Sequence, residues 1–291
     1  MSPSTEPPAP HGSAAPPPAA GVGRTALGVA RVRAAESARP DRLFDDPFAA
    51  AFVAAAPGTL PDVEALDERA AGLLRWVAFF TVVRTRFYDD RLQDAVRAGC
   101  RQVVLVAAGL DARAYRLEWA PGVRLLELDT PDVLAFKQGV LDGASAHARC
   151  DRTAVPSDLL GDWPSALGAT GFRPQEPTAW LVEGLLIYLD AAQAGALLDR
   201  ISDLSAPGSR LACEYQVPRD DDGAHGSAGR PHVPGYTDLW KGGLGTALPG
   251  RLQASGWATE LHDRADVAAG YGRPGPPSGG AGFVVATRTS A

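Results

Sequence analysis

Lysine is nearly absent from this sequence. Only Lys137 and Lys241 occur among the 291 residues, and arginine carries the rest of the positive charge. The formal net charge is −6. Binding to nucleic acid needs a clustered basic face that neutralises phosphates. The composition therefore argues against nucleic acid as a partner.

Cysteine and histidine are also scarce, which weighs against metal and disulfide chemistry. Cys100, Cys150 and Cys213 lie far apart and form no CxxC pair, and the five histidines contain no HExxH or other close pair. Zinc sites and disulfide frameworks both need closely spaced ligands or paired cysteines. We therefore expect no metal site, and a reducing compartment for this chain.

Long apolar runs are missing as well. No stretch of eighteen or more apolar residues occurs, so the sequence predicts no membrane-spanning helix. The N-terminus does not follow the charged-then-apolar order of a signal peptide. We therefore expect a cytoplasmic protein without a membrane partner. Residues 1–20 are rich in Pro, Ala and Ser with little to bury, and they predict a disordered tail.

The stretch from Val103 to Asp129 is the most informative part of the chain. An apolar run, 103–108, is typical of a strand that is buried on both faces of a parallel sheet. Gly109 follows it, then a helix-compatible run, 112–117, and a second apolar strand, 123–128, that ends at Asp129. Strand, glycine turn, helix and strand with a terminal acid form the first half of a nucleotide-binding βαβ unit.

Strands alternate with helices beyond this unit. Further strands are predicted near 148–155, 178–183 and 209–216, and two late strands, 258–262 and 282–287, are expected to pair in antiparallel fashion. The pattern predicts an α/β doubly wound, Rossmann-like mixed sheet. Residues 21–99 are expected to form a helical N-terminal cap, and 100–291 one domain with a lid insertion near 217–255.

Polar groups follow four of the predicted strands. They are Gly109, Asp129, Asp158 and Glu183. Ligands of such sheets bind outside the carboxyl ends of the strands, so these residues are expected to meet at one site. Each acid also has a structural alternative. Asp129 and Asp158 could cap the helices that follow them, and Glu183 could form an ion pair at the edge of the core.

The absence of two motifs narrows the choice of ligand and of enzyme class. The first turn reads G-L-D-A-R and lacks the GxGxxG cradle that anchors a pyrophosphate, which argues against an NAD-dependent dehydrogenase. No GxSxG elbow occurs, which excludes a serine hydrolase on motif grounds. Asp129 lies twenty positions beyond Gly109, the spacing at which an acid binds a ribose diol. A nucleoside with an amino-acid tail, S-adenosylmethionine, fits this pattern better.

Seven ordered motifs carry a more specific signal. They are GVGRTALGVARVRAAES, RLFDDPFA, VVRTRFYDD, QVVLVAAGLDARAYRL, LLELDTPDVLAFK, SDLLGDWPSAL and PTAWLVEGLLIYL, followed by LSAPGSRLACE. Together they resemble the actinobacterial S-adenosyl-L-methionine-dependent methyltransferases related to the leucine carboxyl methyltransferases. The resemblance extends from about residue 21 to 215 and implies a class I methyltransferase fold.

The resemblance assigns roles to cofactor-binding residues. Arg84 would bind the methionine carboxylate, which suits a two-pronged donor, although an ion pair with Asp89 or Asp90 is the alternative. Gly109 would allow the methionine portion to approach the backbone, and Asp129 would accept the ribose hydroxyls.

The remaining implied contacts come from later strands and from the cap. Asp158 would accept the adenine amino group, with Leu159 against the ring. Glu183 would face the methionine amino group or the substrate. Arg31 or Arg33 corresponds to a basic residue near the cofactor. One departure is Ala112, where the family has a small polar residue, and the loop 219–234 matches nothing in the family.

The predicted reaction is methyl transfer to oxygen of a small carboxylate or hydroxylated metabolite. A carboxylate acceptor needs no catalytic base, whereas a phenol or alcohol does. Glu183 and Tyr188 are the first candidates for that role, followed by Glu214 and His232. The alternative is a catalytically inactive methyltransferase-like protein that binds or regulates a partner.

Overall fold

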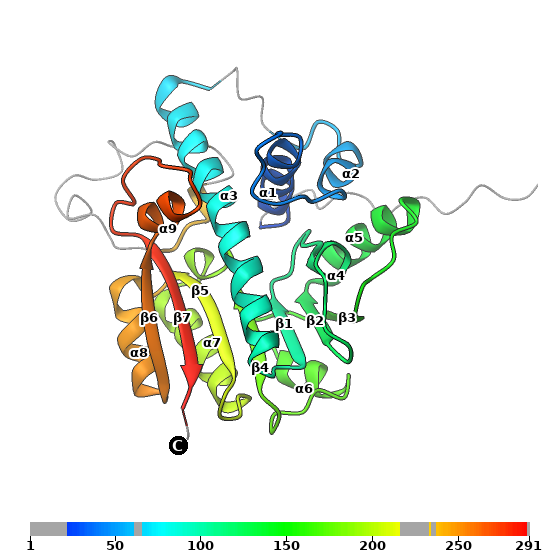
Figure 1. The fold of residues 1–291 in the computed structure, drawn as a ribbon, viewed down its shortest axis with the longest axis vertical. Coiled ribbons are helices and arrows are strands. Elements are labelled where there is room, and N and C mark those ends of the chain that lie inside the picture. Colours follow the sequence, from blue (N-terminus) through cyan, green and yellow to red (C-terminus); the bar gives the residue numbers. More distant parts are fainter. Residues whose placement is uncertain (1–21, 61–65, 216–232, 234–236, 290–291) are drawn as a thin grey trace, which may run out of the picture.

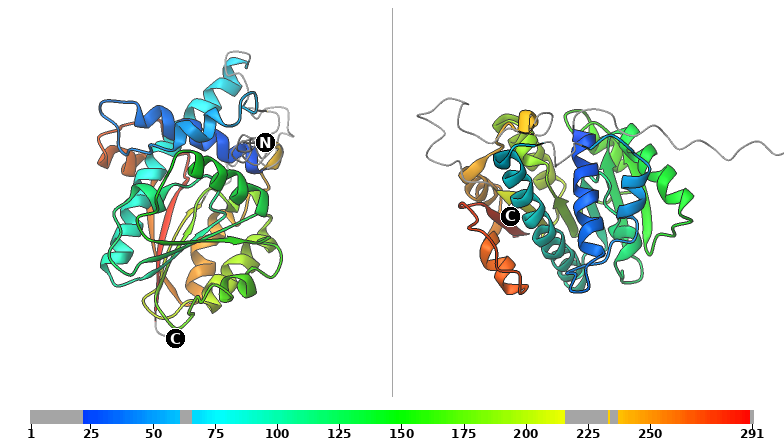
Figure 2. Two further views of the ribbon diagram at one scale, coloured as in Figure 1. Left: turned by 90° about the vertical axis from the view of Figure 1, so that its right-hand side faces the viewer. Right: turned by 90° about the horizontal axis from the view of Figure 1, so that it is seen from above.

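The computed structural model describes residues 22–60, 66–215, 233 and 237–289. The expected tail of residues 1–20 and the larger part of the loop after the fifth strand, His232 included, lie outside these ranges. The described residues form one seven-stranded mixed sheet with helices on both faces (Figures 1 and 2). The predicted α/β doubly wound fold is confirmed.

The strands lie in the order β3-β2-β1-β4-β5-β7-β6. Their bounds are β1 Gln102–Val106, β2 Arg124–Asp129, β3 Asp151–Pro156, β4 Thr178–Val182, β5 Arg210–Tyr215, β6 Trp257–Asp263 and β7 Gly282–Arg288. The first five pair in parallel, and β7 pairs antiparallel with both β5 and β6. The two late strands therefore complete the mixed sheet as the sequence predicts.

Helices cover the two faces of the sheet in separate layers. The α-helices of the described residues are α1 Val22–Ser37, α2 Ala49–Ala54, α3 Glu68–Arg97, α4 Arg113–Arg116, α5 Pro131–Gly143, α6 Trp163–Gly168, α7 Ala191–Asp203, α8 Leu248–Ala254 and α9 Arg264–Gly270. One core joins the sheet to side chains of α1, α2, α3, α5 and α9, and the other joins it to α6, α7 and α8. Every residue of β1 and β4 is buried between these layers, which explains why each strand is apolar after its first residue.

The structure gives the details of two predicted helical stretches. The stretch 62–98, predicted as one or two helices, contains the single helix α3, which Asp67 caps by accepting from the Ala70 N–H at 2.8 Å. The stretch 239–255, predicted as a broken helix, begins with the 3-10 helices Thr237–Leu239 and Gly245–Ala247 before α8. Helix α9 was not expected from the sequence.

The helical N-terminal segment lies across one end of the sheet. Figure 1 and the left view of Figure 2 place α1 and α2 at the end toward which the parallel strands run. Helix α3 continues from there along the sheet and contacts β4 and β5. This position suits a cap over a ligand site, and the domain boundary at residue 99 stays a prediction.

The order of the strands changes direction between β1 and β4. From β1 the chain moves outward to β2 and β3, then returns to place β4 on the other side of β1. Connections diverge at such a point and leave a crevice at the carboxyl ends of the two strands. Gly109 follows β1 and Glu183 follows β4, so the fold brings both residues to this crevice.

In the part of the chain that the structure describes, no helix is long and apolar enough to cross a membrane. Within the same residues, no group of three or more His, Cys, Asp or Glu side chains could hold a metal ion.

Candidate functional site

The turn after β1 has an unusual backbone conformation. Ala107 and Gly109 adopt φ angles of 57° and 51°, in the left-handed region that costs energy for a residue with a Cβ atom. A Cβ atom at Gly109 would lie 3.4 Å from the Cβ of Ala26 in α1. The cap therefore approaches the bare backbone of this turn closely. Strain of this kind is concentrated at binding sites.

Asp129 stabilises the same turn from the end of β2. Its Oδ2 accepts from the Gly109 N–H at 2.6 Å, and its Oδ1 accepts from the Thr130 N–H at 2.7 Å. Thr130, not Asp129, is the N-cap of α5. Burial raises the pKa of Asp129 above its usual value, against the lowering effect of these two N–H groups. The carboxylate can therefore accept further donors that would favour its charged form.

Asp158 lies farther out, beyond the end of β3. The residue is exposed, and its Oδ1 accepts from the Leu160 N–H at 2.9 Å, so the acid shapes its own turn. Asp162, not Asp158, caps the following helix α6. Leu159 is half-buried and packs against the core on the α6–α8 face. The adenine contacts implied for both residues stay predictions.

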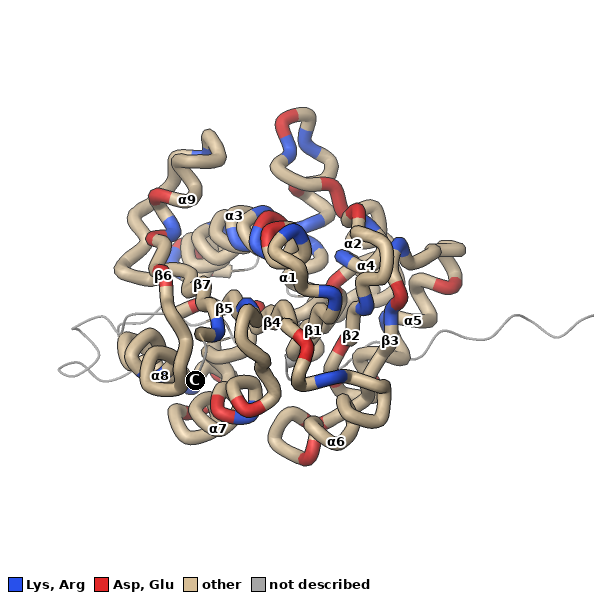
Figure 3. The backbone as a smooth tube through the Cα atoms, turned by 60° about the horizontal axis from the view of Figure 1, so that its bottom comes forward, with Lys and Arg blue, Asp and Glu red and all other residues tan. Residues whose placement is uncertain are grey.

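Glu183 forms the centre of the polar cluster at the crevice. Its Oε1 lies 3.0 Å from Arg33 Nη2 and 3.0 Å from Arg84 Nε, and its Oε2 lies 2.6 Å from Arg113 Nη1. These arginines come from α1, α3 and α4. Figure 3 shows basic and acidic positions side by side where α1 and α3 meet. The cluster therefore joins the cap to the sheet.

The charge state of Glu183 follows from these neighbours. Burial alone would raise its pKa, but the guanidinium groups of Arg113, Arg33 and Arg84 hold the pKa well below its usual range. A general base works best when its pKa lies near the operating pH. Glu183 is therefore suited to binding and orienting a cation, while its catalytic role stays a prediction that this environment disfavours.

Arg113 is a functional candidate that the sequence reasoning missed. Its side chain is completely buried and contacts Asp89, Asp111 and Glu183, with Nε 2.6 Å from Asp89 Oδ1. Its Nη2 also donates to the Thr85 carbonyl at 3.2 Å. The side chain thus fixes the turn after β1 relative to α3 and β4. The available signal was an arginine two positions after the turn's aspartate, inside an otherwise apolar segment.

Arg84 lies at the crevice, as its expected role requires. Its Nε contacts Glu183, and its Nη1 lies 2.9 Å from Glu214 Oε1 at the end of β5. The alternative pairing with Asp89 or Asp90 is wrong, because Asp89 contacts Arg113 and Arg116, and Asp90 contacts Arg86 and Tyr271. Binding of a methionine carboxylate by Arg84 stays a prediction.

Tyr188 belongs to the 3-10 helix Leu186–Tyr188 that follows β4. Burial raises the pKa of its hydroxyl, and the side chains of Thr25 and Trp240 lie beside it. The phenol therefore stays protonated at neutral pH and can donate a hydrogen bond. Of the two expected basic residues of the cap, Arg33 reaches the cluster and contacts Thr85 Oγ1 at 3.4 Å. The structure gives no contact between Arg31 and Glu183.

The depressed pKa of Glu183 makes protein stability depend on pH. A carboxyl group whose folded-state pKa is lowered contributes stability above its unfolded pKa of about 4.3 and loses it as the pH falls toward the folded value. We expect the free energy of unfolding of the wild type to fall more steeply below about pH 5 than that of Glu183→Gln, measured by urea unfolding across a pH series.

Glu118→Gln is the control for this measurement. The Glu118 side chain is 87% exposed and pairs with Arg149 at the surface, where an ion pair contributes little. This variant should keep the wild-type slope. Equal slopes for the wild type and Glu183→Gln would contradict the charge state assigned to Glu183.

Comparison with known proteins shows the family to which the chain belongs. The family model described as leucine carboxyl methyltransferase matches residues 26–202, which is more than half of the chain. A relative from Parafrankia sp. (strain EAN1pec) is 49% identical over 258 residues, which cover 88% of this chain and 83% of the relative. A relative from Frankia alni is 50% identical over 270 residues, which cover 92% of this chain and 95% of the relative. Both relatives are named as S-adenosyl-L-methionine-dependent methyltransferases.

One solved structure shows how low the similarity to this chain is, in sequence and in fold. Human N-acetylserotonin methyltransferase in complex with SAM is 13% identical, with a TM-score of 0.42 over 77% of this chain and 60% of that chain. This likeness is too distant to support an argument about the site. The match to the family model and the identity to the two relatives are sufficient: the chain belongs to the leucine carboxyl methyltransferase family.

Proposed function

We propose that this protein transfers the methyl group of S-adenosyl-L-methionine to an oxygen atom of a small carboxylate or hydroxylated metabolite. The observation that carries the proposal is the pair of contacts at one edge of the sheet: Asp129 at the end of β2 accepts from the Gly109 N–H after β1, and Arg84 contacts Glu183 after β4. Membership of a methyltransferase family and the names of the relatives support the same reaction.

The residues present fit this cofactor. Asp129 is a buried carboxylate whose described donors are two backbone N–H groups, which leaves acceptor capacity for ribose hydroxyls. Gly109 carries no side chain, and the methionine portion of the cofactor would approach its backbone beside the contact with Ala26. Glu183 would hold the methionine amino group and Arg84 the carboxylate. When bound, S-adenosylmethionine supplies an electrophilic methyl group on a sulfonium.

The protein's own contribution to such a transfer is positional. The acceptor oxygen must lie in line with the methyl group at roughly 3 Å, with water excluded. Helices α1 and α2 cover the end of the sheet where the cluster lies, so the cap is placed to exclude solvent (Figure 2). The rigid arginine cluster around Glu183 would orient the cofactor without moving during the reaction.

The test is to incubate the purified protein with S-adenosylmethionine labelled in its methyl group and a panel of small carboxylates, alcohols and phenols. We expect label to be transferred to at least one acceptor, and S-adenosylhomocysteine to bind in calorimetry. Failure of S-adenosylhomocysteine to bind would overturn the cofactor assignment. Binding without transfer to any acceptor would favour the alternative, a methyltransferase-like protein that binds or regulates a partner.

A further inference from the structure

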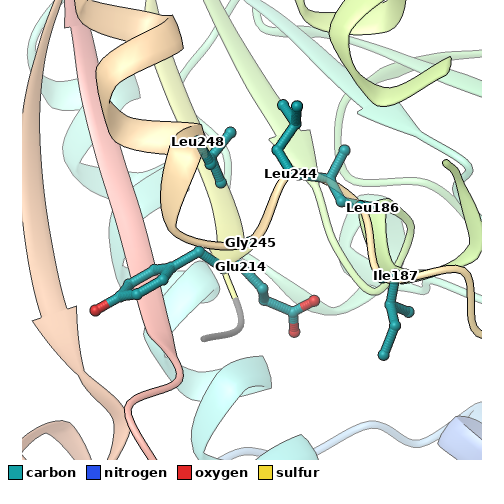
Figure 4. A pocket seen from close by; sticks show the side chains of 9 residues that line it. Leu186, Ile187, Glu214, Leu244, Gly245 and Leu248 are labelled. Carbon is teal, nitrogen blue, oxygen red and sulfur yellow. The ribbon is translucent and has the colours of Figure 1, made fainter. Parts of the chain in front are cut away.

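A pocket lies beside the cluster, at the carboxyl end of β5 (Figure 4). Most of its lining is apolar or is glycine backbone. Its lining includes Leu186, Ile187, Leu244, Leu248, Gly243 and Glu214. The pocket touches the end of β5, the neighbour of β4, and its Glu214 is joined to the cluster by the ion pair with Arg84.

One wall of this pocket is backbone held in a fixed position. The N–H groups of Lys241 and Gly242 donate to the Ile187 carbonyl at 2.7 and 3.1 Å, and the Gly243 N–H donates to the Leu189 carbonyl at 3.0 Å. A Cβ atom at Gly243 would lie 2.7 Å from the Leu186 carbonyl oxygen, and its φ is +62°. Only glycine fits there, so the shape of the wall is set by the sequence.

Glu214 is the charged group of the pocket. Its Oε2 accepts from the Gly184 N–H at 2.8 Å, and its Oε1 lies 2.9 Å from Arg84 Nη1. Although Oε1 is buried and near this cation, no described residue donates a hydrogen bond to it. Figure 4 shows the Glu214 carboxylate and the Ile187 side chain projecting to the same side of the strand end. Oε1 therefore keeps acceptor capacity beside its ion pair with Arg84, in a pocket that Leu186 and Ile187 also line.

We infer that the methyl acceptor presents a hydroxyl group on an apolar body, as in an alcohol or phenol. Its proton is accepted by Glu214, which forms an ion pair with one arginine, whereas Glu183 contacts three. This inference rests on the proposed function. As the acceptor oxygen forms its bond to the methyl carbon, its proton passes to Glu214 Oε1, and the carbon–sulfur bond breaks with its electron pair left on sulfur. Charge is balanced, because a sulfonium and a carboxylate become a thioether and a carboxylic acid.

A carboxylate acceptor does not suit this pocket. It would lie next to Glu214 and Glu183, and a buried anion needs a cation or several donors. Arg84 already contacts both of these carboxylates. Lys241 flanks the pocket through its backbone, but its Nζ donates to Gln193 Oε1 at 3.3 Å on α7. Arg264, the other buried arginine whose charge interacts with Glu214, lies over the rings of Trp76, Phe80 and Phe283. The described side chains thus supply an acceptor for a hydroxyl proton, while both cations near it are already engaged.

The experiment compares two probes of matched shape, 4-propylphenol and 4-propylbenzoate, with methyl-labelled S-adenosylmethionine. An aryl ether survives mild alkali, whereas a methyl ester releases labelled methanol. We expect alkali-stable label from the phenol and none from the benzoate. Label that alkali releases from the benzoate at an equal or higher rate would overturn the inference while leaving the proposed methyltransferase function intact.

Two variants test whether Glu214 is the group that accepts the proton. Glu214→Gln should lower the rate of transfer to 4-propylphenol by about 100-fold or more, the loss expected for a general base. Its dissociation constant for S-adenosylhomocysteine should change by less than about threefold, because glutamine keeps an acceptor for the Gly184 N–H. Glu260→Gln, whose side chain is 76% exposed, is the matched control and should keep the wild-type rate. An unchanged rate in Glu214→Gln would overturn the proton-acceptor role.

A binding measurement tests whether the pocket accepts a hydroxyl-bearing ligand and does not require methyl transfer. Calorimetry of the complex with S-adenosylhomocysteine should detect 4-propylphenol and not 4-propylbenzoate, and Ile187→Trp, which fills the pocket, should abolish phenol binding. If neither probe is methylated, this pattern still supports the hydroxyl pocket, whereas absence of phenol binding overturns it. Loss of S-adenosylhomocysteine binding in the wild type would instead be a failure of the proposed function.

Discussion

Replacing Arg113 with methionine is expected to lower the free energy of unfolding by about 3–5 kcal/mol. The side chain is completely buried among Asp89, Asp111 and Glu183, and methionine has a similar length without any donor. Because three carboxylates would lose a buried partner at once, the cost is that of uncompensated charge and not only of a lost contact. Urea unfolding measures this change.

Two further variants separate this effect from a general loss of surface charge. Arg113→Lys keeps the charge but not the planar fork, and it should recover only part of the stability. Arg97→Met removes an arginine that is 67% exposed and pairs with Asp94 one turn earlier, so it should cost less than about 1 kcal/mol. If Arg113→Met costs no more than Arg97→Met, the central role of Arg113 in the cluster is wrong.

Replacing Asp129 with alanine is expected to weaken binding of S-adenosylhomocysteine by at least about 100-fold. Hydrogen bonds to a charged acceptor contribute about 1.5–3 kcal/mol each, and a ribose diol offers two donors, so the loss is about 3 kcal/mol or more. The variant also removes the acceptor for the Gly109 N–H, which holds the turn after β1 in place. Isothermal titration calorimetry measures the dissociation constant.

The pH dependence of binding gives a second, independent signature of Asp129. Burial raises the pKa of this carboxyl, and hydroxyl donors would favour its charged form. Affinity in the wild type should therefore fall as the pH drops through the raised pKa, whereas Asp129→Asn should bind weakly with little pH dependence of this origin. Asp132→Ala, an exposed acid in the first turn of α5, is the control and should bind like the wild type. A threefold change or less in Asp129→Ala would refute the assignment.

Local sequence patterns predicted the sheet with small errors. The five parallel strands and the antiparallel pair lie within a few residues of the expected ranges, because apolar runs between turn residues report burial on both faces. The least accurate of these predictions was that of the third strand, which was expected near 148–155 and is observed at Asp151–Pro156. This strand is largely exposed, so its residues carry little of the apolar signal that marks the others.

The meeting of Gly109 and Asp129 was also predictable from the sequence. The two residues follow neighbouring parallel strands, and their pairing in register places both at one edge of the sheet. Asp158 was predicted at the same edge, and the structure puts it there as an exposed residue that bonds to its own turn. The sequence indicated the edge on which it lies, but not how far the turn carries it from the crevice.

The sequence by itself determined the class of fold, the family and the edge of the sheet at which the candidate residues lie, because strand periodicity, glycine turns and ordered motifs are local features. Only the tertiary structure decided what surrounds Glu183. Arg113 and Arg33 reach it from 70 and 150 positions away, and Glu214 joins it through Arg84. The physical reason is that ion pairs in a buried cluster form only after the helices of the cap have packed against the sheet. The spacing of these residues along the chain does not predict which of them come into contact.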